Sequence, residues 1–185
     1  MNGLPFLHTN SPTINFLAVQ SRKTRNTQSI IQGLQTVTNI YTKRGFILNS
    51  IFGDNGFNIM ALHYAILPTA IHIFAVGNHC SIVERLICSI KERCGCICHL
   101  APHRKYTKLM VYSLIDNIIY WLSSFLSKVS ASQTISPADI ITGWKFLDFN
   151  NKLIPFGAYT WVYTKTTNII KSMRVLAIAL APSNE

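Results

Sequence analysis

Apolar residues in the first half of the chain recur first at the spacing of strands and then at the spacing of a helix. Residues 4–9 and 13–20 are short β-rich runs, with turn residues at 10–12 between them. Residues 29–41 carry apolar side chains at helical spacing. We therefore predict a hairpin followed by a helix, and the apolar run at 46–52 predicts the next strand.

The second half of the chain favours helices and a β-rich tail. Helices are expected at about 80–98, 105–126 and 136–143, and strands at 154–163 and 176–182. The shortest helix opens with a Ser-Pro pair and closes on a glycine, which is typical of helix ends. This order of elements predicts an α/β fold with one mixed sheet.

Residues 57–77 are uncharged and long enough to raise the alternative of a membrane-spanning helix. Pro68 divides this stretch and two histidines interrupt it, so we expect a helical half, a turn and a buried strand. A second apolar stretch, at 109–126, contains Asp116, which is costly in lipid. The N-terminus lacks the basic region of a signal peptide. We expect a nuclear or cytoplasmic protein that is not secreted and does not span a membrane.

The charge balance points to an anionic partner. The 185 residues include 17 Lys and Arg but only 7 Asp and Glu, which gives a formal net charge of +10. This charge suits nucleic acid or an anionic membrane surface, with incidental basicity as the alternative. No acidic residue precedes Asp54. Any site that needs several carboxylates must therefore draw on few side chains.

Five cysteines lie between residues 80 and 98 and do not look like a disulfide framework. The C-x-C-x-C-H order from Cys94 to His99 differs from the paired spacings of zinc sites. A helix would also point these side chains in different directions. We expect small residues on a helix, some of them buried, rather than a zinc site.

Asp54 and Glu84 are candidate metal ligands. Asp54 ends a predicted strand and precedes the pair Asn55-Gly56, which favours a turn because both residues tolerate positive φ. Glu84 follows 30 positions later, on a predicted helix. Phosphodiester chemistry uses divalent ions held by carboxylates, and a strand-end Asp and a helical Glu can meet across one sheet edge. Any two acids 30 positions apart share this spacing. The alternative is that Asp54 serves only to start a turn and that Glu84 is a solvated helix residue.

The residues around these acids resemble those of a known family. The D-N-G triplet at 54–56 resembles the motif at the second catalytic aspartate of retroelement integrases, and residues 83–93 look like the helix with their catalytic glutamate. Residues 11–20 look like the third strand of that fold. Further blocks follow in the order of copia-type retrotransposon polyproteins, at 120–122, 135–143 and 154–159.

A copia-type retrotransposon integrase catalytic core implies an RNase H-like fold, in which helices flank a mixed sheet. We assign this core to residues 1–150 and a short β-rich C-terminal extension to residues 151–185. In intact relatives the chemistry is end processing and strand transfer of element DNA with Mg²⁺ or Mn²⁺. The resemblance implies DNA as the partner and no small-molecule substrate, and it leaves a homo-oligomer open.

The resemblance also assigns roles to individual residues. Asp54 would be the second metal ligand and Glu84 the third. The cations of the same predicted helix would lie beside the DNA backbone, where they position phosphates without reading sequence. These cations are Arg85, Lys91 and Arg93.

The sequence departs from the family at the first catalytic acid. The family needs three acids, the first in the opening strand, and matching residues 11–20 to the third strand places that aspartate before Met1. We therefore expect a fragment truncated at the N-terminal strand. Two carboxylates on one side cannot easily hold two mutually repelling ions, so we expect no catalysis here and leave open that no metal is bound. The alternatives are a non-catalytic basic nucleic-acid-binding protein and, with less support, a small membrane protein.

Overall fold

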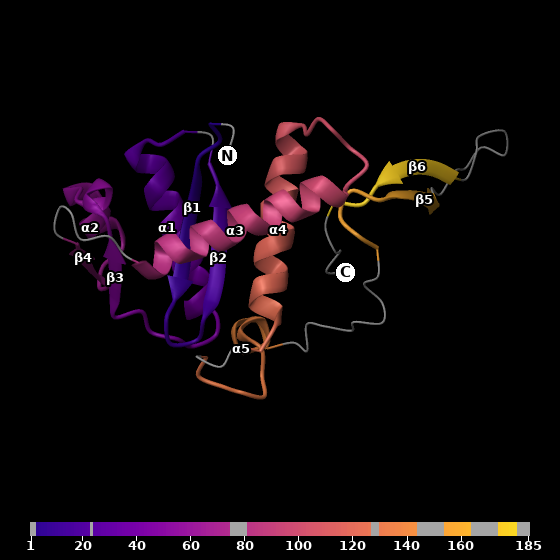
Figure 1. Ribbon diagram of the computed structural model, residues 1–185. Helices are drawn as coiled ribbons and strands as arrows, with labels where there is room; N and C mark the ends of the chain where they lie inside the picture. The colour runs from indigo at the N-terminus through magenta and orange to yellow at the C-terminus, as the bar shows by residue number, and fades with distance from the viewer. Residues whose placement is uncertain are drawn as a thin grey trace. The chain divides into compact units, whose positions relative to one another are not determined.

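The computed structural model describes most of the chain, in six stretches: residues 3–22, 24–74, 81–126, 130–143, 154–163 and 174–180. These stretches contain six β-strands, five α-helices and one 3₁₀ helix (Figure 1). The chain divides into two compact units, and each is described by itself. The first unit comprises residues 1–89 and 119–146, and the second comprises residues 90–118 and 147–185. The boundary predicted at residue 150 lies outside the described residues.

The first unit opens with an antiparallel hairpin of β1 (Phe6–Ser11) and β2 (Phe16–Ser21). Both predicted strands are confirmed, but the prediction of a turn at 10–12 is wrong, because the first two of these residues belong to β1. The chain reverses over 12–15 instead. Asn15 adopts a left-handed φ of 59°, which asparagine tolerates better than most residues, and its N–H donates to the Ser11 carbonyl at 2.7 Å.

The helix predicted at 29–41 is confirmed as α1 (Thr27–Thr42). Its N-cap is Asn26, whose side-chain oxygen accepts a hydrogen bond from the Ser29 N–H at 2.9 Å. After the helix, Gly45 takes a φ of 78°, which only glycine adopts at little cost. The residues that α1 buries recur at helical spacing: Ile31, Gly33, Leu34, Val37 and Tyr41.

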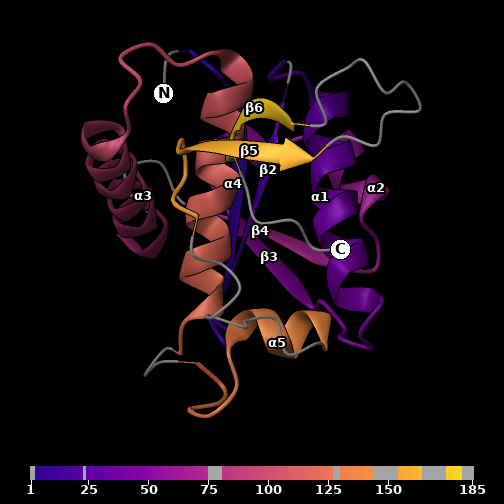
Figure 2. The same cartoon turned by 90° about the vertical axis from the view of Figure 1, so that its right-hand side faces the viewer.

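Two parallel strands follow, β3 (Ser50–Gly53) and β4 (Ala70–Ile73), which lie side by side in Figure 2. Between them the chain forms the 3₁₀ helix η1 (Asn55–Phe57) and the helix α2 (Met60–Ala65). The expected division of this apolar stretch into a helix, a turn and a strand is confirmed up to residue 74. The expectation that this strand is buried is wrong, because Ala70 and His72 of β4 are exposed and none of its residues is fully buried. The strand predicted at 46–52 is shorter than expected, because it pairs with β4 only from Ser50 onward.

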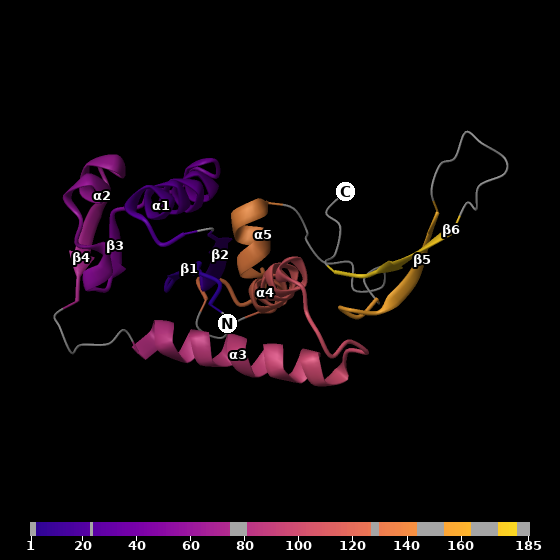
Figure 3. The same ribbon diagram turned by 90° about the horizontal axis from the view of Figure 1, so that it is seen from above.

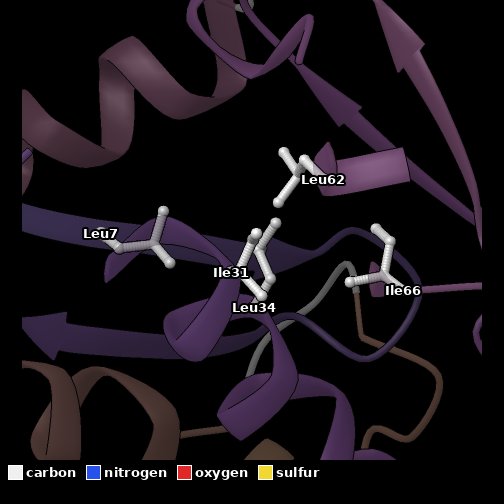
Figure 4. Close-up of a cluster of buried hydrophobic side chains, with 5 residues drawn as sticks. All are labelled: Leu7, Ile31, Leu34, Leu62 and Ile66. Atoms are coloured by element: carbon white, nitrogen blue, oxygen red, sulfur yellow. The ribbon is translucent and has the colours of Figure 1, made fainter. Parts of the chain in front are cut away.

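Helix α1 joins the hairpin to the parallel pair. One buried cluster combines side chains from β1, α1 and the α2 region (Figure 4): Leu7, Ile31, Leu34, Leu62 and Ile66. A second cluster combines the hairpin, α1 and α5: Ile14, Ala18, Val37, Tyr41 and Ile141. Since a two-stranded sheet is marginal alone, packing against this helix is what stabilises both sheets.

The remaining helices are α3 (Ser81–Leu100), α4 (Lys108–Ser124) and α5 (Pro137–Thr142). Helix α5 lies on the same side of the hairpin as α1, as Figure 3 shows. It begins and ends as its sequence predicts. The Ser136 hydroxyl accepts from the Asp139 N–H at 3.1 Å, and Gly143 closes the helix with a φ of 72°. Helices α3 and α4 each contribute residues to both units.

In the second unit, β5 (Tyr159–Tyr163) and β6 (Arg174–Ile178) form an antiparallel ribbon. Strands were predicted at both places, and β6 begins two residues earlier than expected. Before β5, Gly157 takes a φ of 81°, and its N–H donates to the Ala179 carbonyl at 2.7 Å. This bond closes the base of the ribbon.

The α/β class is confirmed, whereas the prediction of one mixed sheet is wrong for the part of the chain that the structure describes. The six strands there form three separate two-stranded sheets, β1–β2, β3–β4 and β5–β6. The hairpin and the parallel pair are connected by side-chain packing on α1, with no shared strand. Within the same described ranges, no helix combines the length and apolar content needed to cross a bilayer.

Candidate functional site

Asp54 follows directly on β3 and caps the 3₁₀ helix η1. Its Oδ1 accepts a hydrogen bond from the Gly56 N–H at 3.0 Å, and its backbone carbonyl accepts from the Phe57 N–H at 3.0 Å. This is the Asx turn that aspartate favours. A turn was expected here, but neither Asn55 nor Gly56 takes a positive φ. One oxygen of the exposed Asp54 carboxylate thus already has a structural partner.

The parallel pairing of β3 and β4 places Asp54 at a defined edge. The Phe74 N–H donates to the Gly53 carbonyl at 3.0 Å, so the carboxyl ends of both strands lie together. From this edge the chain continues through residues outside the described ranges to α3. Glu84 is exposed in the first turn of α3, where an acid is also favourable to the helix dipole. The expected meeting of Asp54 and Glu84 stays a prediction.

The donor set of the candidate metal site is small. In the described ranges, no three His, Cys, Asp or Glu side chains are grouped so that they could hold a metal ion. Asp54 and Glu84 supply two carboxylates, and one oxygen of Asp54 is engaged by Gly56. Carboxylate oxygens suit Mg²⁺ or Mn²⁺ chemically. Two such side chains alone do not fit a centre that must hold two divalent ions.

The predicted DNA-contacting cations of α3 all have exposed side chains: Arg85, Lys91 and Arg93. Successive residues of an α-helix are turned by about 100°, so Lys91 and Arg93 point about 160° apart. Glu92 between them is exposed as well. The three cations therefore do not form one stripe, and they offer phosphates separate contacts around the helix.

The cysteines of α3 differ in their surroundings. Cys88 and Cys96 are exposed, whereas Cys94 is buried. Burial, with a smaller contribution from the neighbouring Cys98, raises the pKa of the Cys94 thiol to about 11. A thiol that stays protonated at neutral pH is a poor metal ligand. The expectation that some of these cysteines are buried helix residues is confirmed.

The structure also contains a hollow that the sequence pattern did not indicate. It has a volume of about 530 Å³ and lies beside α2, with five lining residues: Asn58, Met60, His63, Tyr64 and Leu67. Neither candidate metal ligand lines it. The sequence shows only that Met60 and Tyr64 are large residues one helical turn apart. The structure adds that both are more than two-thirds exposed beside this hollow.

A second feature was missed on the β5–β6 ribbon. The strand sequence YTWVY places an aromatic residue at every second position, and all three of these rings are exposed. Alternate residues of a strand share one face, so this signal was readable from the sequence.

No protein-family model matches the chain, and no curated protein is significantly similar to it. The resemblance to copia-type integrases therefore rests on the order of the motifs in this sequence.

Proposed function

We propose that this chain is a non-catalytic, nucleic-acid-binding remnant of a retroelement integrase core. The observation that carries the proposal is the position of the D-N-G triplet. It follows directly on β3, which is parallel to β4, and the helix with the glutamate motif comes next in the chain. A second metal ligand at a strand end and a third on the following helix is the arrangement that the family resemblance implies.

The proposed RNase H-like fold also accounts for the separation of the two sheets in the first unit. The hairpin β1–β2 and the parallel pair β3–β4 both pack on α1 through a common cluster, without a strand between them in the described residues. An opening strand, which in the family carries the first acid, is the element that would join such sheets into one.

The proposed inactivity follows from the carboxylates. Two-metal strand transfer needs ligands that bridge and flank two ions, and their charges must offset the repulsion between those ions. Asp54 and Glu84 supply two negative charges, and Asp54 is held in a turn by Gly56. We infer that the position has kept its turn-forming role and has lost its role as a ligand.

Binding of DNA is supported by the charge of the chain. The 17 basic and 7 acidic residues leave an excess of ten positive charges, and the cations on α3 are exposed. Phosphate contacts of this kind release counterions, so the affinity should fall steeply with salt and depend little on base sequence.

The experiment is a salt titration of binding to a labelled DNA duplex, measured by fluorescence anisotropy. Changing Arg85, Lys91 and Arg93 together to Gln should weaken binding uniformly across sequences and lower the slope of log K against log salt by roughly 1 for each of these cations that contacts a phosphate. The charge-matched control changes three exposed cations elsewhere: Arg25, Lys43 and Lys108. An unchanged slope in the α3 variant, or a wild type that binds no DNA, contradicts the proposal.

A further inference from the structure

The β5–β6 ribbon exposes a row of aromatic rings. Tyr159, Trp161 and Tyr163 occupy alternate positions of β5, so their side chains project from the same face. Their exposed fractions are 57%, 64% and 69%. Large aromatic residues are normally buried, and three in a row on an exposed face indicate a binding surface.

The paired strand completes this face. The register places Ile178 opposite Tyr159, Leu176 opposite Trp161 and Arg174 opposite Tyr163. The Arg174 guanidinium lies over the Tyr163 ring, 5.1 Å from its centroid. A permanent positive charge is therefore fixed at one end of the aromatic row.

The other end of the row is anchored within the second unit. The ring of His103 packs edge-on against Tyr159, with centroids 5.2 Å apart, and its Nε2 lies 2.9 Å from the Gly157 carbonyl oxygen. The Gly157 N–H donates to the carbonyl of Ala179, the residue that follows β6. The row is thus held in place before any ligand arrives, which reduces the entropy lost on binding.

The spacing and the charge of this face fit one ligand class. Alternate residues of a strand are about 6.7 Å apart, roughly twice the 3.4 Å separation of stacked bases. Each ring can therefore accept a base without displacing its neighbour. Arg174 gives this face a positive charge, and the sequence of residues 151–185 contains four basic side chains and one acidic one, which suits a phosphate backbone.

We propose that the aromatic face of the β5–β6 ribbon binds single-stranded nucleic acid. Bases stack on Tyr159, Trp161 and Tyr163, and Arg174 contacts a phosphate next to the last stacked base. This inference rests on the proposed nucleic-acid binding and adds a site for unpaired strands in the second unit, apart from the α3 cations of the first proposal.

The test measures anisotropy with labelled dT15, rU15 and a DNA duplex at one salt concentration. Trp161→Ala should weaken binding of both single strands by about 10-fold, because stacking contributes a factor of this order per base. Trp161→Phe should retain most of the affinity, because it keeps a ring. Binding of the duplex should change little in both variants.

The matched control is Val162→Ala, which alters the opposite face of the same strand and should leave single-strand binding unchanged. Far-UV circular dichroism confirms that each variant is folded. Single-strand affinity that is equal in Trp161→Ala and the wild type overturns this site, while retained duplex binding leaves the first proposal standing. A wild-type dimer that Trp161→Ala dissociates with unchanged single-strand affinity also overturns it, and assigns the face to contact between copies. A wild type that binds no nucleic acid overturns both proposals.

Discussion

Ser123 of α4 closes the outer edge of β2 at Leu17. The Ser123 Oγ accepts a hydrogen bond from the Leu17 N–H at 3.2 Å and donates to the Leu17 carbonyl at 3.3 Å. The two residues are 106 positions apart in the sequence, and both are buried. One hydroxyl group thus satisfies the two backbone groups that a neighbouring strand would otherwise pair.

Replacing Ser123 with Ala should destabilise the first unit by about 1–3 kcal/mol, because it leaves a buried N–H and a buried carbonyl without a partner. The measurement is the midpoint of urea unfolding followed by circular dichroism. Thr36→Ala is the control, since its exposed hydroxyl bonds only to the Gln32 carbonyl of its own helix. Equal midpoints for the two variants would contradict the role assigned to Ser123.

Two glycines should respond in opposite directions to the same substitution. Gly143 has a φ of 72°, and a Cβ there would meet the guanidinium of Arg44, whose Nε donates to the Ile141 carbonyl at 2.8 Å. Gly143→Ala should therefore destabilise the protein by roughly 1 kcal/mol or more. Gly95 lies inside α3, and a methyl group added there would meet no other atom within 4 Å. Gly95→Ala should therefore stabilise the helix by up to about 1 kcal/mol.

Thermal unfolding of both glycine variants against the wild type measures this difference. A destabilising Gly95→Ala would mean that the interior of α3 is not a regular helix at that residue. An unchanged melting temperature in Gly143→Ala would mean that Arg44 does not cover the end of α5.

His8 should make stability depend on pH. Burial lowers the pKa of His8 below its ordinary value of 6.5, and its Nδ1 is buried without a hydrogen-bond partner among the described residues. Below pH 6.5 the unfolded chain takes up a proton that the folded chain does not bind. The stabilisation is therefore complete above pH 6.5 and declines as the pH falls from there.

The measurement compares urea midpoints at pH 7.5 and pH 5.5 in the wild type, His8→Gln and His99→Gln. The loss of stability at pH 5.5 should be smaller in His8→Gln than in the wild type, and His99→Gln is the matched control at an exposed histidine. An equal loss in all three proteins would show that His8 does not titrate differently in the folded state.

Asp54 should behave as a turn residue in stability measurements. Asp54→Ala removes the acceptor for the Gly56 N–H and should cost about 1 kcal/mol, whereas Asp54→Asn keeps an acceptor and should cost less. Mg²⁺ should not raise the melting temperature of the wild type. A rise with Mg²⁺ that both Asp54→Asn and Glu84→Gln abolish would show that the two carboxylates bind the ion together.

The sequence predicted the elements whose signals are local. Apolar spacing predicted α1 from residue 29 onward, and Ser136 and Gly143 bounded α5, because these signals depend on residues within one or two turns. The Asn26 cap, which begins α1 two residues earlier, was not predicted. The hairpin turn was misplaced because several residues between 10 and 15 are compatible with a turn. Only the pairing register of β1 with β2 determines that the chain reverses over 12–15, with Asn15 in the left-handed conformation. Pairing between distant strands is not encoded in the pattern of one strand, so the separate sheets could not be predicted.

The candidate site shows the same division. The Asx turn at Asp54 was one of two alternatives offered by the residues that follow it, and the structure confirms that turn. The proximity of Asp54 and Glu84 depends on how α3 follows β4 across residues outside the described ranges, which neither spacing nor motif order specifies. The sequence shows that aromatic residues occupy alternate positions of β5, so that their rings share one face. It does not show that these rings are exposed, because their exposure depends on the absence of a third strand beside them in the described part of the ribbon.

The most direct test of the central claim is an assay of strand cleavage and joining on a DNA end that the protein has bound. The wild type, Asp54→Asn and Glu84→Gln are incubated with an end-labelled duplex in Mn²⁺ or Mg²⁺, with binding followed on a native gel and products on a denaturing gel. The account predicts that all three proteins bind the DNA and that none gives a metal-dependent product. Nicking or joining by the wild type that is lost in both variants would contradict it.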